Sequence, residues 1–354
     1  MRPLRGLHRK KTGSASAGCR QVKCFLIMKG YPLGMPPIAV HAAPPVVCVT
    51  RGEGGSARAQ SFQASWLVIA CGFLVALLTL KVTGMGILVT SVAPLVCFAV
   101  ALVGVQAYYT RYRFDERIVA TCGILAILIS ACLLAAIISH ASLRLRAPQI
   151  DGALDGADLA LGLYAPAIVL KLSKYPAFAA LLGVIYSSAM PVCVITALAL
   201  AASGRRARAC EFAFSFTFCI LLAATVSAGF PALGSTVYHG MESTAGLPSQ
   251  AGTFHMATVE YFRNDPSAIF DLAKVQGIVT FPSFHMVMAI LLPYALRGET
   301  RIGIWIAVIW SLLVALSSVV IGGHYVIDLL AGAATWAASA WLIRSAGRDP
   351  DRAR

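Results

Sequence analysis

The stretch that decides the fold is Ile118–Ser139, which reads IVATCGILAILISACLLAAIIS and contains no charged side chain. At 1.5 Å per residue, a helix of this length measures roughly 33 Å, enough to cross the ~30 Å hydrocarbon core of a bilayer. Apolar residues occupy almost every position, so no polar face is left for water. The stretch therefore predicts a transmembrane helix over residues 117–140.

Apolar runs of similar length recur on both sides of this stretch and predict an all-α fold, a polytopic membrane helical bundle of about eight transmembrane helices. Short polar connections between the runs make neighbouring helices antiparallel. The predicted spans are 62–80, 84–109, 117–140, 176–203, 209–230, 279–297, 301–322 and 324–343.

The composition excludes several other classes of protein. Of the 354 residues, 58% are hydrophobic and 12% are charged, against roughly one half and one quarter in soluble domains. The mean hydropathy is +0.77. A soluble globular enzyme and a disordered chain are both excluded. The ten cysteines include no C-x-x-C pair, and most lie in apolar runs, so they predict neither a metal site nor a disulfide framework.

The net charge of +14 predicts membrane orientation rather than a nucleic-acid partner, because basic residues gather on one side of the spans. With both termini inside, 22 Lys and Arg lie on the inner side and 7 on the outer side. The inner set is the ten within residues 1–61 together with Arg111, Arg113, Arg117, Arg205, Arg206, Arg208, Arg297, Arg301, Arg344, Arg348, Arg352 and Arg354. The outer set is Lys81, Arg144, Arg146, Lys171, Lys174, Arg263 and Lys274.

Two outer loops are long. Residues 141–175 carry Asp151, Asp155 and Asp158 at helical spacing, which indicates a helix lying in the membrane interface. A solvated acidic face is the preferred interpretation of these three residues, and a three-carboxylate metal site is the alternative. Residues 231–278 form a polar loop that is long enough to have a function. His140, alone in its span, is interpreted as a hydrogen-bonded packing residue.

Three ionisable residues at the ends of apolar runs are the candidate catalytic residues, since such residues are costly in a membrane. His285 begins the sixth predicted span, and His324 and Asp328 lie where the seventh span meets the eighth, at a similar depth on the outer side. His324 and Asp328 are spaced i,i+4, so the carboxylate could hold the Nδ1 proton and leave Nε2 nucleophilic. His285 could act as the general acid. Backbone N–H groups near Ser283 and Gly323 could bind an anion.

Pro282-Ser283-Phe284-His285 and the segment Gly323–Gly332, GHYVIDLLAG, resemble the second and third motifs of the type 2 phosphatidic acid phosphatase superfamily. The Ser-Phe-His and His-Tyr-x-x-Asp forms are most similar to its inositolphosphotransferase branch, which includes inositol phosphorylceramide synthases. The resemblance implies a six-helix core with a metal-independent site, no cofactor, His324 as the nucleophile, Asp328 as its orienting partner and His285 as the acid.

The motifs depart from the superfamily at the cationic positions. Where the third motif usually has Ser-Arg, this chain has Ser317 and Ser318, and the first motif has no clear counterpart. Arg263 and Lys274 of the outer loop are the nearest replacements, so the predicted phosphate-binding residues are Arg263, Lys274, Ser283 and Gly323.

The sequence therefore predicts an integral membrane lipid phosphatase or phosphotransferase, in the plasma (inner) membrane, with its site on the outer or periplasmic side. Its expected partners are a membrane lipid phosphate and the bilayer. Water and an alcohol remain alternative acceptors. The rival functions are a proton-coupled transporter of small solutes and a non-catalytic member of the superfamily. The predicted organisation is a flexible basic extension (1–61), N-terminal transmembrane helices (62–140), a catalytic membrane domain (141–345) and a cytoplasmic tail (346–354).

Overall fold

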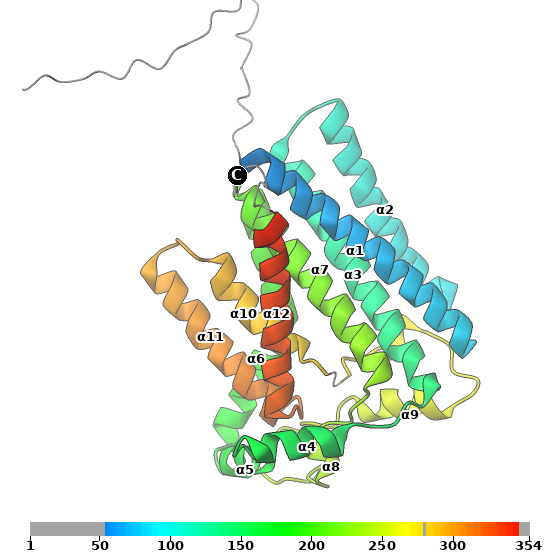
Figure 1. Ribbon diagram of the computed structural model, residues 1–354, viewed down its shortest axis with the longest axis vertical. Helices are drawn as coiled ribbons and strands as arrows, with labels where there is room; N and C mark the ends of the chain where they lie inside the picture. The colour runs from blue at the N-terminus through cyan, green and yellow to red at the C-terminus, as the bar shows by residue number, and fades with distance from the viewer. Residues whose placement is uncertain (1–53, 279–280, 347–354) are drawn as a thin grey trace, which may run out of the picture. The chain divides into compact units, whose positions relative to one another are not determined.

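The computed structural model describes residues 54–278 and 281–346, and within them the regular structure is helical (Figure 1). The α-helices are α1 Gly54–Thr83, α2 Val89–Arg111, α3 Glu116–Ser142, α4 Asp151–Ala160, α5 Ala165–Leu172, α6 Pro176–Ala202, α7 Arg206–Gly229, α8 Ser235–Tyr238, α9 Met256–Asn264, α10 Phe284–Ala295, α11 Arg301–Val320 and α12 Val326–Ala346; two 3-10 turns are η1 Leu143–Leu145 and η2 Leu272–Lys274.

Seven of these helices are long and apolar enough to cross a membrane: α1, α2, α3, α6, α7, α11 and α12. Each overlaps one of the predicted spans over most of its length, so the prediction of a polytopic helical bundle is confirmed. Helix α1 begins at Gly54, inside the predicted N-terminal extension. The rest of that extension, like residues 347–354 of the predicted tail, lies outside the described residues.

The predicted span 279–297 is wrong as a full crossing. The helix there, α10, has 12 residues and measures about 18 Å, which is too short for a ~30 Å core. The chain enters α10 through Pro282 and Ser283, and Ser283 has an extended backbone. Since proline has no N–H and disfavours a helical conformation in the residue before it, the helix begins only at Phe284.

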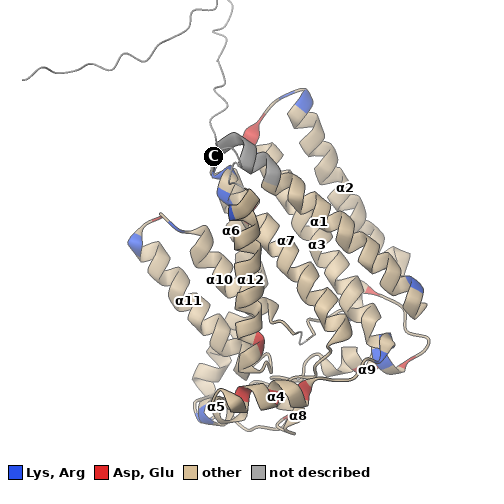
Figure 2. Cartoon of the chain, in the orientation of Figure 1, with Lys and Arg blue, Asp and Glu red and all other residues tan. Residues whose placement is uncertain are grey.

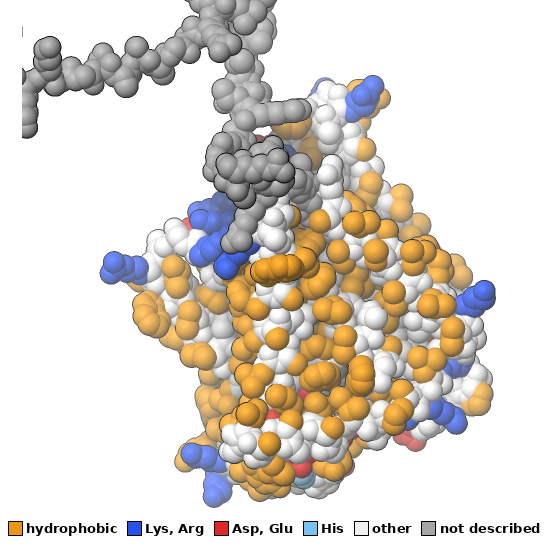
Figure 3. Space-filling view, viewed as in Figure 1, with side chains coloured by type: hydrophobic (Ala, Val, Ile, Leu, Met, Phe, Trp, Pro, Cys, Tyr) orange, Lys and Arg blue, Asp and Glu red, His pale blue; other side chains and the backbone are white. Residues whose placement is uncertain are grey.

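The buried centre of the bundle lies on α3 and α7. Ile124, Ile127 and Ile138 of α3 and Phe212 and Phe216 of α7 are almost completely buried. The outer helices instead turn large apolar side chains outward, as Figure 3 shows for one face of the molecule. An exposed apolar surface of this extent is typical of a surface that contacts lipid.

In the seven long helices, the charged side chains that the structure describes lie near the helix ends, which leaves the middle of the bundle uncharged in Figure 2. At the end where α6 meets α7 and α10 meets α11, Glu299 pairs with Arg205 and Arg208 at 2.9 and 2.6 Å. At the same end, Arg297 pairs with Glu211. Helices α4, α5, α8 and α9 lie across the opposite end (Figure 1).

The acidic residues of α4 are not a solvated face. Asp151 and Asp158 are 3% and 1% exposed, and both accept hydrogen bonds from backbone N–H groups of other segments. Asp155 pairs with His239 at 2.8 Å. The interpretation as a solvated face is therefore wrong, although the helix itself is present. In the described part of the chain, no group of three or more His, Cys, Asp or Glu side chains is arranged to hold a metal ion.

Candidate active site

The turn between α11 and α12 carries the first candidate residue, His324. Helix α11 ends with the N–H groups of Ile321 and Gly322 both donating to the Ser317 carbonyl, at 2.8 and 3.1 Å. Gly323 then has a φ of +75°, a left-handed conformation that costs other residues about 1–2 kcal/mol. The His324 N–H donates to the Ser318 carbonyl at 3.1 Å, which fixes the backbone from which the imidazole projects.

The His324 imidazole is hydrogen-bonded on both ring nitrogens. Its Nδ1 lies 3.1 Å from Oδ2 of Asp328, and the Tyr325 N–H donates to the same oxygen at 3.1 Å. A carboxylate can only accept, so Nδ1 carries the proton and Nε2 keeps a lone pair. Nε2 lies 3.4 Å from Oγ of Ser283. His324 and Asp328 are 2% and 0% exposed, so the pair is held rigidly in a dry environment.

The start of α10 packs directly on α12, and this contact brings the two sequence motifs together. The Ser283 N–H donates to the Asp328 carbonyl at 3.1 Å. A Cβ on Gly332 would lie 2.3 Å from the Ser283 carbonyl oxygen, so only glycine allows this approach. The close packing sets the position of Ser283, and with it the position of His285 two residues later.

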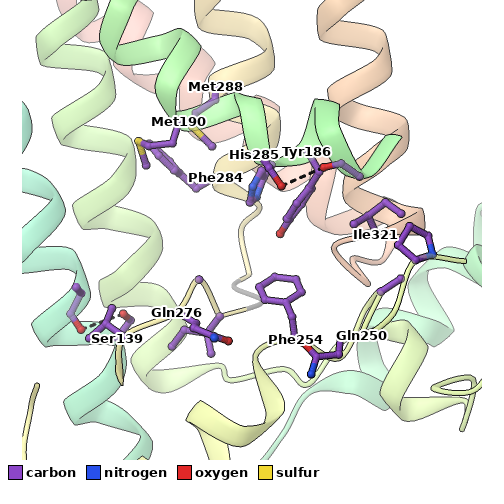
Figure 4. A pocket seen from close by; sticks show the side chains of 18 of the residues that line it. Ser139, Tyr186, Met190, Gln250, Phe254, Gln276, Phe284, His285, Met288 and Ile321 are labelled. Atoms are coloured by element: carbon purple, nitrogen blue, oxygen red, sulfur yellow. Dashed lines mark hydrogen bonds between the residues drawn. The ribbon is translucent and has the colours of Figure 1, made fainter. Parts of the chain in front are cut away.

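His285 lies beside the buried pair, and neither His324 nor Asp328 lines the cavity that His285 borders. Its ring centroid is 6.1 Å from that of His324, and the ring stacks on Tyr186 of α6 at 4.1 Å. A phosphate group could contact both imidazoles at this separation, given a hydrogen-bond reach of about 3 Å from each side. His285 also lines a cavity, where Figure 4 shows it beside Tyr186.

The cavity has a volume of about 940 Å³ and lies among α3, α6, α7, α10 and the loops around Gln250 and Gln276. Its walls are mainly apolar, and none of the described residues that line it is Asp, Glu, Lys or Arg. On the α6 side it is bordered by exposed residues, among them Val184, which is 68% exposed. The cavity is therefore accessible from the flank of the bundle, where the surface is apolar. His140, which contributes to the opposite wall, bonds the Ala136 and Gln276 carbonyls, as its interpretation as a packing residue predicts.

The two predicted cationic residues are not brought to the histidines. The Arg263 guanidinium donates to the Ala147 carbonyl at 3.3 Å, in a small basic cleft that it shares with Arg144 and Arg146. Lys274 donates to the Tyr261 hydroxyl at 3.2 Å and lies over the same ring. Neither residue lines the cavity beside His285. Proximity in the sequence was the only signal for them, and it does not specify the direction of a side chain in a long loop.

Three residues near the site were missed by sequence reasoning: Tyr325, Asp151 and His255. Tyr325 is fully buried, and its hydroxyl donates to Asp151 at 3.2 Å. Burial, helped by the neighbouring Asp151 carboxylate, raises the pKa of Tyr325, so the hydroxyl remains a donor. His255 is 0% exposed and its Nε2 bonds the Leu233 carbonyl at 2.9 Å. Burial lowers the pKa of His255 to about 4, so its ring is neutral at physiological pH.

Fold and site together define a class: an integral membrane helical bundle that holds a buried histidine–aspartate pair and a second histidine beside an uncharged cavity at one end. Residues 153–342 match the model of the PAP2 superfamily, the type 2 phosphatidic acid phosphatases. The matched segment is more than half of the chain, and the chain belongs to this superfamily, whose members are phosphatases and phosphotransferases. The superfamily prediction is thereby confirmed. Neither the comparison with curated proteins nor the comparison with solved structures finds a match.

Replacing Gly323 with Ala should lower both stability and activity. The left-handed backbone costs alanine about 1–2 kcal/mol, and the new Cβ would lie 3.1 Å from the Gly252 backbone, so the turn that carries His324 must shift. We expect a thermal midpoint several degrees lower in detergent. Gly156→Ala is the matched control, because it adds a methyl group to a helix where nothing lies within 4 Å. Equal stability of the two variants would contradict the strained turn.

Acid should destabilise the fold through His255. Its folded pKa of about 4 lies below the unfolded value of ~6.5, so only the unfolded chain takes up a proton as the pH falls between these values. Stability is therefore retained above pH ~6.5 and lost on acidification towards pH 4. Thermal midpoints measured from pH 7.5 to 4.5 should decline less steeply in His255→Gln than in the wild type. If the thermal midpoints of the two proteins decline in parallel as the pH falls, protonation of His255 does not contribute to the destabilisation by acid.

Proposed function

We propose that this protein is an integral membrane phosphotransferase that acts on a lipid phosphate through a phosphohistidine at His324. The observation that carries the proposal is the orientation of the His324 ring. Its Nδ1 lies 3.1 Å from the Asp328 carboxylate, its Nε2 carries the lone pair and has only the long 3.4 Å contact with Ser283 Oγ, and a second imidazole lies with its centroid 6.1 Å away. This arrangement suits attack on phosphorus by a nitrogen lone pair.

The proposed reaction has two steps. His324 Nε2 attacks phosphorus, a P–N bond forms and the P–O bond to the leaving alcohol breaks. His285, which takes up a proton when the phosphate anion binds beside it, gives that proton to the leaving oxygen. Asp328 stabilises the positive charge that develops on the His324 ring. In the second step an acceptor hydroxyl attacks phosphorus and gives its proton to His285, and the P–N bond breaks. Water as acceptor yields hydrolysis, and an alcohol yields a new phosphoester.

The walls of the cavity support a lipid as the donor. They are mainly apolar, and the border on α6 includes Val184, which is exposed on the flank of the bundle. Acyl chains could therefore remain among the outer surfaces of the helices while the headgroup enters beside His285. Pulling the chains into water would cost about 0.8 kcal/mol per methylene group, so a site reached from the flank of the bundle suits a lipid whose chains stay in hydrocarbon.

The missing cations support a phosphodiester donor, as in the inositolphosphotransferase branch. The described lining of the cavity carries no Lys or Arg, and Ser317 and Ser318 occupy the positions of the superfamily's Ser-Arg pair. Desolvating a dianionic phosphomonoester without a cation is costly, because the desolvation cost of an ion rises steeply with its charge. A phosphodiester carries a single charge, which protonated His285 and nearby N–H groups could balance.

We further propose that the protein lies in the plasma (inner) membrane with the site on the outer side. The described Lys and Arg at the end of the bundle opposite the site number nine, from Arg111 to Arg344, against seven at the site end. The acidic residues have the opposite bias, which makes the site end the less positive one. This distribution, with the basic N-terminal sequence, agrees with the rule that positive charge stays inside.

Loss of His324 should abolish turnover. In purified full-length protein, His324→Ala should reduce release of headgroup phosphate from lipid micelles by at least ~10³-fold, and His285→Ala by about 10²–10⁴-fold. His239→Ala is the control, because His239 pairs with Asp155 and not with the catalytic residues. Labelled donor should yield an acid-labile phosphoenzyme in the wild type. Full activity of His324→Ala would eliminate the proposed nucleophile.

The charge of the donor should decide the rate. With phosphatidylinositol and phosphatidic acid in matched micelles, we expect kcat/KM to be at least ~10-fold higher for the phosphodiester, a difference of about 1.4 kcal/mol. Diacylglycerol release measures both reactions. Preference for phosphatidic acid would reject the headgroup-transfer assignment and leave a lipid phosphatase, since the same histidines serve both reactions.

A further inference from the structure

Helix α4 lies across the end of the bundle (Figure 1). Two of its carboxylates, on Asp151 and Asp158, are buried and accept hydrogen bonds from the chain around the turn that carries His324. We propose that Asp151 and Asp158 are positioning residues that hold His324 in its reactive orientation by hydrogen-bonding the chain on both sides of it. The effect on kcat rests on the proposed function. The effect on hydrogen exchange around His324 does not depend on it.

Asp158 caps the helix that carries Asp328. Its two carboxylate oxygens accept from the N–H groups of Val326 and Ile327, at 2.8 and 2.7 Å. These are the first two residues of α12, whose N–H groups have no partner within the helix. The preceding residue is Tyr325, which has no short side-chain oxygen to cap them. The Asp158 carboxylate, from a helix distant in the sequence, accepts these hydrogen bonds instead. It lies at the N-terminus of α12, where the helix dipole favours negative charge.

Asp151 holds the other flank of the turn. It accepts from the Gly234 N–H at 2.9 Å and from the Leu233 N–H at 3.0 and 3.1 Å. The next residue, Ser235, donates its N–H to the Gly323 carbonyl at 2.7 Å. Asp151 also accepts from the Tyr325 hydroxyl at 3.2 Å. His324 thus lies between two residues, Gly323 and Tyr325, that Asp151 restrains.

The two carboxylates share one face of α4. Asp151, Leu154 and Asp158 are spaced i, i+3 and i+7, which places them in a row on a helix. Leu154 is 5% exposed and belongs to the same apolar cluster as Tyr325. Leu159, by contrast, is 54% exposed. The row therefore forms a single contact surface, with a hydrogen-bonding group at each end and an apolar side chain between them.

The physical basis of positioning is the cost of burial. A carboxylate buried without a cationic partner is stable only while several donors surround it. Each of the donors to Asp151 and Asp158 is therefore held at a defined distance, and the turn cannot move without leaving a buried charge unsatisfied. Because a misplacement of 1 Å can cost about 10²-fold in rate, this restraint bears directly on the reaction at His324.

The test compares Asp158→Ala with Asp158→Asn and with Asp155→Ala as a matched control. Asparagine keeps an oxygen that accepts an N–H, whereas alanine removes it. Asp155 lies on the same helix and pairs with His239. With phosphatidylinositol micelles, we expect Asp158→Ala to lower kcat at least ~10-fold with KM within about 2-fold. Asp158→Asn should recover only part of the loss, because its amide keeps one of the two acceptors and turns an NH2 toward the other N–H, and Asp155→Ala should keep wild-type kcat.

Tyr325→Phe provides a variant that should fold normally. It removes only the hydroxyl that donates to Asp151, which keeps its donors at Leu233 and Gly234, and we expect kcat to fall about 3- to 10-fold with a thermal midpoint only a few degrees lower. Wild-type kcat in both Asp158→Ala and Tyr325→Phe would overturn the proposal. So would a loss in Asp158→Ala that only follows the loss of folded protein, or one that Asp158→Asn does not recover even in part.

Hydrogen exchange supplies the readout that is independent of activity. In Asp158→Ala, peptides covering residues 321–328 should exchange at least ~10-fold faster than in the wild type, with Asp155→Ala unchanged. If residues 321–328 exchange at the wild-type rate in Asp158→Ala, the proposed restraint is rejected, even if activity falls. If the wild type shows no turnover of any lipid phosphate, the proposed function fails, while the exchange result still decides whether α4 holds the turn.

Discussion

The structure depends on the burial of negative charge against N–H, O–H and imidazole donors rather than against cations. Asp328, Asp151 and Asp158 are each at most 3% exposed, and their hydrogen bonds in the described part of the chain run to backbone amides, one phenol and one imidazole. A buried carboxylate of this kind tolerates little movement, because each lost donor leaves it uncompensated. The turn around His324 is therefore held in place by the donors that these three carboxylates require.

The long helices and the site make different demands on the sequence. Helices such as α3 and α7 need only apolar side chains of suitable size, and their charged residues gather at the ends, where Glu299 and its two arginines tie neighbouring turns together. The site needs particular residues at particular angles, such as the left-handed Gly323 and the close approach at Gly332. A rigid bundle thus presents a small, precisely folded group of turns at one end.

Much of this arrangement could be predicted from the sequence, since hydropathy and spacing are local properties. Seven spans follow from apolar runs, and the His324–Asp328 contact follows from the i,i+4 rule. The roles of Asp151 and Asp158 could not be predicted, because the same helical spacing serves a solvated face and a buried one. The face of α4 is buried because the loop at Leu233 and the start of α12 donate hydrogen bonds to Asp151 and Asp158. Both segments lie far from α4 in the sequence.

The shortness of α10 places its start against the second turn of α12, where Ser283 meets Gly332, rather than at the end of the bundle. The helix runs about 18 Å from the end stabilised by Arg297 before it stops at Phe284. In a hydrocarbon layer ~30 Å thick, a helix of that length leaves part of the crossing uncovered. In the proposed reaction, a lipid phosphate would therefore meet His285 inside the bundle, beside a cavity whose walls are mainly apolar. Such walls would favour a lipid alcohol over water as the acceptor, since the alcohol can approach from within the bilayer.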